Sequence, residues 1–312
     1  MFTVEYVVVP VDLSASSRGT YALARAINNT PPQTHLVHAW GGWPSYLKNV
    51  LFPYAPLGED VVEFEHEIAL EAEAAIFEMF ELPDELPEDL DDPAVIRGHA
   101  RDVLPEHIQG IAAQLIVVGS HGESGLIPNS LGSVAERLVR TAKRPVLVAR
   151  ATSSKPSIRR ITAALDLSRG CHIVLEHAIG LAMQTGAELE TIFVLPDPAA
   201  NDTTQVMSSI VQFTADKAKK QARGRIDAHF DSVVKNLDVP FGKKDETARL
   251  LKDRKLLVGD PAAQLVSHCA ENNSDVLVIG SQDGTRKITQ RIGDVAGRVL
   301  RTANTHVMVV PL

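Results

Sequence analysis

Four residues in the first half of the chain have a spacing that suits the binding of an anion. Gly119, Gly122 and Gly132 are separated by two and then nine residues, and Ser133 follows directly. Glycine lets backbone N–H groups approach a ligand closely, and a helix that begins near Ser133 would add unpaired donors and the positive end of its dipole. The pattern therefore predicts a loop that binds phosphate.

The same residues also fit a loop that binds nothing, because glycine is common after a strand and serine is a preferred N-cap. Neither the lysine-bearing phosphate loop GxxxxGK[ST] nor the dinucleotide fingerprint GxGxxG occurs in the chain. From the spacing alone, both interpretations stay open.

Internal repetition indicates how the chain positions this loop. EYVVVPVDLS near the start recurs as RRITAALDLS, so that Asp12 corresponds to Asp166. QLIVVGSHG recurs as DVLVIGSQDG, and RLVRTAKRPVLVAR recurs as RVLRTANTHVMVVPL. The chain is a tandem duplication, and we predict domains at residues 1–150 and 158–312, joined by the small and polar stretch ATSSKPS.

Each copy contains five short apolar runs, separated by longer amphipathic segments. The runs are YVVVPV, HLVHAW, AVIRG, LIVVG and PVLVA in the first copy and ITAAL, TIFVL, LLVG, VLVIG and HVMVV in the second. Such continuous hydrophobicity is typical of parallel strands covered on both faces. We expect an α/β fold of two tandem, doubly wound, five-stranded parallel-sheet domains, with the ligand at the carboxyl ends of the strands.

Composition and charge exclude several classes of protein. The chain has 312 residues, 45% hydrophobic and 22% charged, with no leader and no apolar run of membrane-spanning length, so we expect a cytoplasmic protein without a membrane partner. Fifteen acids and no Lys or Arg lie between Glu59 and Asp92, and a nucleic-acid partner is not expected. Apolar residues at helical spacing favour a solvated helix face there over a docking surface for a basic partner.

Other reactive residue types show no functional spacing. Cys171 and Cys269 are the only cysteines, and we expect both to be small buried residues. The histidines share no spacing that would form a zinc site, so no metal site is predicted. No serine or cysteine occupies a strained elbow beside a base, and we predict no catalytic residue.

The chain resembles a tandem universal stress protein over nearly its whole length. The family's nucleotide motif is a glycine, two residues, a glycine, nine residues, a glycine and then serine or threonine. The residues that match it in full are Gly119, Gly122, Gly132 and Ser133. VVPVD matches the end of the family's first strand, and its third-strand glycine corresponds to Gly98 and Gly259. The resemblance implies an adenine nucleotide alpha hydrolase-like fold and a stress-response role.

The resemblance also implies an adenine nucleotide, ATP or AMP, as the partner of the first copy, with Mg²⁺ arriving on ATP. After Gly119, the groups that would hold the phosphates belong to Gly122, Gly132, Ser133 and Val134. The residues that would line the base pocket are Pro10, Val11, Ala39 and Val118. Asp12 would face the nucleoside, although an aspartate after a strand equally fits a cap of the next helix.

The second copy departs from the motif at the phosphate positions. It keeps Gly280 and Gly293, but Asp283 replaces the second glycine and Asp294 replaces the serine. One unit charge about 4 Å from a phosphate costs on the order of 4 kcal/mol in a partly wet site, although three basic residues of the same loop would offset part of it. We therefore expect one nucleotide per chain, bound by the first half.

Single-domain members of the family associate through their last strands, so the resemblance predicts an internal pseudo-dimer. PVLVAR and HVMVVPL would lie antiparallel across a pseudo-twofold axis and hide two sheet edges. A further homodimer stays open.

Several functional alternatives also stay open. The insert from Gly41 to Gly58 follows the second strand and is either a packed surface loop, a lid over the nucleotide or a partner-binding patch. The chain could instead be a nucleotide-free scaffold that acts through its surfaces. A slow ATPase or self-phosphorylating enzyme is the third class, although no base, arginine finger or metal-binding aspartate is placed for phosphoryl transfer.

Overall fold

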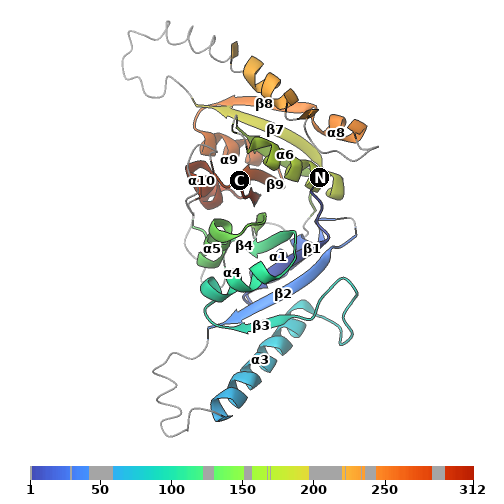
Figure 1. Ribbon diagram of the computed structural model, residues 1–312, viewed down its shortest axis with the longest axis vertical. Helices are drawn as coiled ribbons and strands as arrows, with labels where there is room; N and C mark the ends of the chain where they lie inside the picture. Colours follow the sequence, from blue (N-terminus) through green and yellow to red (C-terminus); the bar gives the residue numbers. More distant parts are fainter. Residues whose placement is uncertain are drawn as a thin grey trace, which may run out of the picture.

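Strands and helices alternate within each half of the chain in the computed structural model, over the residues that it describes (Figure 1). The structure describes residues 2–28, 30–41, 59–121, 130–150, 157–166, 168, 170–196, 220–221, 223–232, 234–235, 244–282 and 292–312. All ten predicted strands are present, which confirms the predicted alternation. None of the helices in these ranges has the length and apolar character of a membrane span.

The first half contains five strands, which follow the predicted apolar runs. They are β1 (Tyr6–Val11), β2 (Gln33–Trp40), β3 (Ala94–Arg97), β4 (Leu115–Gly119) and β5 (Val146–Ala149). The helices described between them are α1 (Ala15–Arg25), α3 (Glu59–Phe80), α4 (Ala100–Gly110) and α5 (Ser133–Thr141). β1 and β4 are buried along almost their whole length, as expected for strands covered on both faces.

The second half repeats this plan. Its strands are β6 (Arg160–Leu165), β7 (Glu188–Leu195), β8 (Asp253–Val258), β9 (Val276–Gly280) and β10 (His306–Val310). The helices are α6 (Cys171–Thr185), α8 (Lys244–Leu250), α9 (Pro261–Glu271) and α10 (Asp294–Thr302). Residues 223–232 are helical as well.

The ten strands form one sheet in the order β3-β2-β1-β4-β5-β10-β9-β6-β7-β8. Neighbouring strands within each half are parallel, whereas β5 and β10 pair antiparallel, with Met308 opposite Leu147. These two residues occupy the same place in the two repeats. A pseudo-twofold axis therefore passes between them, and the internal pseudo-dimer through the last strands is confirmed.

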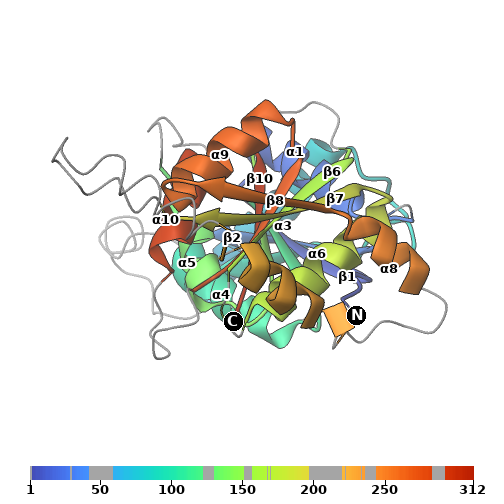
Figure 2. The same cartoon turned by 90° about the horizontal axis from the view of Figure 1, so that it is seen from above.

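Two apolar clusters lie on opposite faces of the sheet, because alternate residues of each strand point to opposite sides. One cluster includes Ile76 of α3 and Leu175 of α6, together with residues of α1. The other includes Leu138 of α5 and Val299 of α10, together with residues of α4 and α9. Helices thus flank the strands in the view along the long axis (Figure 2), and each face buries its own core.

The first part of the acidic run forms the helix α3, in which Ile76 is completely buried. The prediction that the acids form a solvated helix face does not hold for two acids that follow α3, because they accept hydrogen bonds from other elements. Asp89 Oδ2 accepts a hydrogen bond from Arg25 Nη2 at 2.7 Å, and Asp91 Oδ2 accepts one from Tyr6 Oη at 2.6 Å. Burial, with the Asp91 carboxylate, raises the pKa of Tyr6 to about 12. These acids hold the segment before β3 against α1 and β1, which a helical pattern does not reveal.

The start of the first half packs on α6 of the second half. Gln184 Oε1 accepts a hydrogen bond from Val4 N at 2.9 Å, and Gln184 Nε2 donates to Val4 O at 3.1 Å. The rings of Phe2 and His177 lie 4.3 Å apart. Gly180 makes this contact feasible, since a Cβ there would lie only 2.1 Å from the carbonyl oxygen of Phe2. The halves are therefore joined at α6 as well as through β5 and β10.

Candidate functional site

A pocket of about 560 Å³ opens at the carboxyl ends of β1, β2 and β4. The residues predicted from the sequence that line it are Pro10, Val11, Asp12, Ala39, Val118, Gly119, Gly132, Ser133 and Val134. Gly122 and residues 42–58 of the insert after the second strand lie outside the described residues. The volume falls in the range of small-ligand pockets, at the sheet edge where parallel α/β folds bind them.

Two glycines of the motif stand where a side chain would crowd neighbouring atoms. A Cβ at Gly132 would lie 3.1 Å from the carbonyl oxygen of Ser120, to which the Gly132 N–H donates a hydrogen bond at 2.7 Å. A Cβ at Gly119 would lie 3.3 Å from Oγ1 of Thr20. The glycines therefore let the loop return closely to the end of β4.

The helix after the loop is capped by glycine and not by serine. The N-cap of α5 is Gly132, with a ψ of 145°, and Ser133 is the first helical residue. The interpretation of Ser133 as the N-cap is wrong, because the helix is capped one residue earlier, at Gly132. A side chain at that position would crowd the carbonyl oxygen of Ser120, so the cap position suits glycine. Among the described residues no side chain caps α5. Its first-turn N–H groups and the positive end of its dipole therefore lie at the pocket wall that Ser133 and Val134 form.

Asp12 borders the pocket and also organises the turn into α1. Its Oδ1 accepts hydrogen bonds from Ser14 N at 3.1 Å, from Ser14 Oγ at 2.6 Å and from Ser17 Oγ at 2.8 Å. The N-cap residue of α1 is Ser14, so Asp12 supports the cap from two residues before it. Asp12 therefore supports the start of α1 without being its N-cap, and its place at the pocket leaves the nucleoside role a prediction.

Sequence reasoning missed a polar wall of this pocket, formed by Ser16, Ser17 and Thr20 of α1. It also missed His121, whose Nε2 lies 2.9 Å from Ser130 Oγ and whose carbonyl oxygen accepts a hydrogen bond from Ser16 Oγ at 3.2 Å. The remaining lining residues are Ala100, Leu104 and Ala135. A comparison of the two copies could have indicated this wall, because the second copy has glycine, cysteine and valine at the three corresponding positions and so lacks all three hydroxyl groups.

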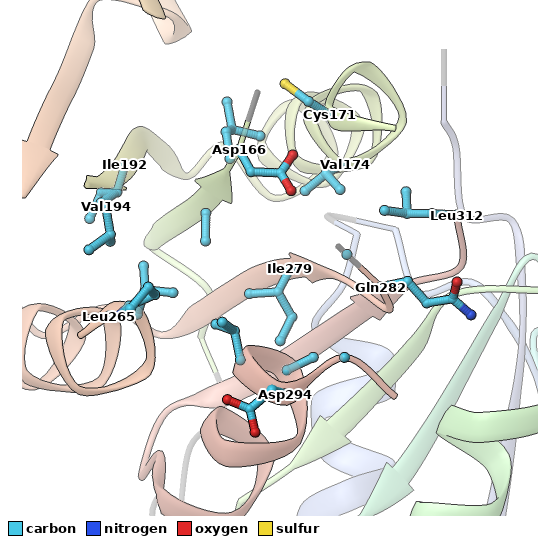
Figure 3. A pocket seen from close by; sticks show the side chains of 17 residues that line it. Asp166, Cys171, Val174, Ile192, Val194, Leu265, Ile279, Gln282, Asp294 and Leu312 are labelled. Carbon is cyan, nitrogen blue, oxygen red and sulfur yellow. The ribbon is translucent and has the colours of Figure 1, made fainter. Parts of the chain in front are cut away.

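The second half has a smaller pocket, of about 220 Å³, at the corresponding edge of the sheet (Figure 3). All but one of the residues that line the first pocket have their repeat counterpart in its lining. The exception is Gly170, where a Cβ would lie 2.9 Å from Cδ1 of Leu312. The side chain of Leu312 therefore takes part of the space that stays open in the first half.

The second pocket also differs in charge and width. Asp294 stands where Ser133 does, with its side chain 84% exposed and Oδ2 4.0 Å from Nη1 of Arg298. Val194 and Ile279 replace the smaller Ala39 and Val118. Asp283 lies outside the described residues. A carboxylate thus lies in the second pocket at the place that the motif serine has in the first.

The cysteines and His268 are engaged in packing. Burial, with the nearby Asp166, raises the pKa of Cys171 to about 12, and burial raises that of Cys269 to about 11. Both thiols are buried and free, as predicted, and stay protonated. His268 Nε2 lies 2.5 Å from Oε2 of the buried Glu190. Across the described part of the chain, no three His, Cys, Asp or Glu side chains gather to hold a metal ion.

Known proteins share both the sequence pattern and the fold. The sequence model of the universal stress protein family matches residues 4–150 and again residues 157–311. A functionally unknown protein from Pseudomonas aeruginosa PAO1 is similar in structure, with 16% identity and a TM-score of 0.58 over 99% of this chain and 92% of that chain. A universal stress protein from Archaeoglobus fulgidus is 17% identical, with a TM-score of 0.57 over 98% of this chain and 96% of that chain.

At these identities the two structures show a shared two-domain fold and leave the ligand undecided. The family match is stronger, because it covers both halves and includes the glycine loop of each. The chain therefore belongs to the universal stress protein family, as a tandem of two such domains.

Proposed function

We propose that the first half binds an adenine nucleotide, ATP or AMP, and that the chain acts as a nucleotide-dependent regulatory protein in the cytoplasm under stress. The observation that carries the proposal is the convergence of the described motif residues on one pocket of about 560 Å³. In this proposal residues 1–150 form the nucleotide-binding domain. Residues 158–312 form a domain whose own pocket takes no nucleotide.

The phosphates would lie at the start of α5. Gly132 keeps the loop close to β4, and the N–H groups of Ser133 and Val134 belong to a helix turn without a side-chain cap. Such a turn carries unpaired donors and partial positive charge, which suits an anion. The Ser133 hydroxyl would add another donor. Mg²⁺ would enter with ATP, coordinated by phosphate oxygens and water.

The base and ribose would lie nearer the strands. Val11, Ala39 and Val118 lie at or next to the last residue of three neighbouring strands and offer an apolar surface for the flat face of a base. Asp12 borders the same space, and its carboxylate can accept hydrogen bonds from ribose hydroxyls. The polar wall on α1 adds three hydroxyl groups, so the pocket offers both apolar and polar surface, as binding of a nucleotide requires.

Binding is supported more strongly than turnover. Asp12 and His121 are the ionisable side chains among the described residues that line the pocket. Asp12 accepts hydrogen bonds from Ser14 and Ser17, and His121 is hydrogen-bonded to Ser130, so neither is placed as a base for an attacking water. Any hydrolysis of bound ATP should therefore be slow.

Isothermal titration calorimetry with ATP on the full chain tests the assignment of the site. We expect one nucleotide per chain, loss of binding in Gly132→Asp, and unchanged binding in Gly293→Asp, which adds the same charge to the second half. Circular dichroism and thermal unfolding of both variants control for folding. Undiminished binding in Gly132→Asp, or two nucleotides per chain, would overturn the assignment.

The identity of the nucleotide needs a separate experiment. Heating the purified protein and identifying the released compound by mass spectrometry would distinguish ATP from AMP. A protein that contains no nucleotide and binds none in the titration would instead support the scaffold alternative.

A further inference from the structure

The second pocket has the shape of a binding site, but its chemistry differs from that of the first. We infer that it binds a small organic cation with an apolar body, such as an arylalkyl amine. The inference concerns residues of the second half and is independent of nucleotide binding in the first.

The backbone around the second pocket is the same as around the first. The Gly293 N–H donates to the Ser281 carbonyl oxygen at 2.8 Å, as Gly132 does to Ser120 at 2.7 Å. Gly293 is the N-cap of α10, with a ψ of 153°. The second copy has therefore kept the backbone arrangement of the loop and the helix start, and the difference between the pockets lies in their side chains.

The polar wall of the first pocket is apolar in the second. Cys171 and Val174 take the places of Ser17 and Thr20. Val174 Cγ2 would lie 3.4 Å from a Cβ at Gly280, just as the Thr20 hydroxyl lies against Gly119. A methyl group therefore stands where the first pocket has a hydroxyl group.

The rest of the second pocket is also apolar and well buried. The side chains that form this surface are those of Leu165, Ile192, Val194, Leu265 and Ile279. Leu165, Leu265 and Ile279 are each at most 6% exposed. A ligand held here must present an apolar body, because such walls offer no partners for its polar groups.

The charged side chains of this pocket are all acidic among the described residues that line it. They are Asp166 and Asp294, which lie on opposite sides of Ile279 in Figure 3. Arg298 pairs mainly with Asp260, since its guanidinium binds Asp260 at 2.7 and 2.8 Å and stays 4.0 Å from Asp294. The carboxylates therefore favour a cation and repel a phosphate.

The size of the pocket limits the ligand further. Its volume is about 220 Å³, against about 560 Å³ in the first half, and below the usual range for drug-sized ligands. One ring with a short alkyl chain fits this space better than a nucleotide. The ring would contact Val194, Leu265 and Ile279, and the ammonium group would lie between Asp166 and Asp294.

Methyl NMR on the full chain with 2-phenylethylamine as the probe tests the inference, because it separates the two pockets. We expect titratable shifts of the Ile279 and Val194 methyl groups and none at Val11 and Val118. Two probes with the same ring vary only the charge. Neutral 2-phenylethanol should bind at least about tenfold more weakly, and anionic phenylacetate should not bind.

Variants then assign the charge recognition to the carboxylates. The double change Asp166→Asn and Asp294→Asn should weaken amine binding at least about tenfold, whereas Asp12→Asn in the first half should leave it unchanged. Thermal unfolding of each variant controls for folding, and ATP titration is a second control for the double variant, whose changes lie outside the first pocket. Equal affinity for the amine and the alcohol, shifts at Val118 in place of Ile279, or tighter binding of adenosine there would each overturn the inference. The result of the ATP titration with the wild-type chain tests the nucleotide site of the first half and does not bear on this inference.

Discussion

Replacing Ser133 by aspartate copies into the first pocket the residue that the second pocket has at the same position. The change should leave the helix intact, because Asp294 is the first residue of α10 behind a glycine N-cap of the same geometry. An acidic residue in the first turn also interacts favourably with the helix dipole. Any loss of nucleotide binding beyond that of a neutral variant, which also lacks the Ser133 hydroxyl, would then come from the added charge.

The size of the effect follows from the exposure of the carboxylate. A unit charge about 4 Å from a phosphate costs roughly 4 kcal/mol at an effective dielectric constant of about 20. The side chain of Asp294 is 84% exposed, so solvent screens much of such a charge. Taking about half of the Coulomb value gives roughly 2 kcal/mol, or about a 30-fold increase in the Kd for ATP.

Isothermal titration calorimetry with ATP would measure this increase, with Ser133→Asn as the neutral control of nearly equal size. We expect Ser133→Asn to bind within about threefold of the wild type, and the difference between the two variants to shrink at about 1 M salt, where the Debye length is about 3 Å. Equal loss of affinity in both variants, or a difference that salt does not change, would refute the electrostatic argument.

Three further predictions concern stability. Gly180→Ala should destabilise the chain by about 2 kcal/mol in urea unfolding, because its Cβ would lie 2.1 Å from the Phe2 carbonyl oxygen and displace that segment. Gly19→Ala is the matched control, because a Cβ there has nothing within 4 Å, and it should stabilise α1 by up to about 1 kcal/mol. Gly98→Ala should cost about 1–3 kcal/mol in the same assay, because its φ is +135°; an unchanged midpoint would contradict the geometry. Burial raises the pKa of Glu190, but hydrogen bonds from its lysine and histidine partners outweigh this and lower it. Glu190 should therefore stabilise the fold at pH values above the ordinary carboxyl pKa of 4.5 and lose this effect as the pH falls below it, so Glu190→Gln should flatten the acid side of the stability profile below that pH.

The sequence was sufficient for the plan of the chain and for most of its candidate site. Repeated segments define two halves, and apolar runs of strand length mark all ten strands. The positions of Asp12, Ala39 and Gly132 in one pocket also follow from sequence, because parallel strands bring their carboxyl ends to the same edge of the sheet. Local sequence patterns are sufficient to place a residue where the course of the backbone alone determines its position.

Tertiary structure decided what depends on side chains from distant segments. The polar wall of α1 meets His121 across about a hundred residues of chain, and Leu312 fills space beside Gly170 in the second pocket. The contact of Phe2 with α6 likewise joins residues far apart in sequence. Periodicity indicates which face of an element is buried, but not which side chain will face it, because that partner is chosen by the packing of the whole sheet and its helices.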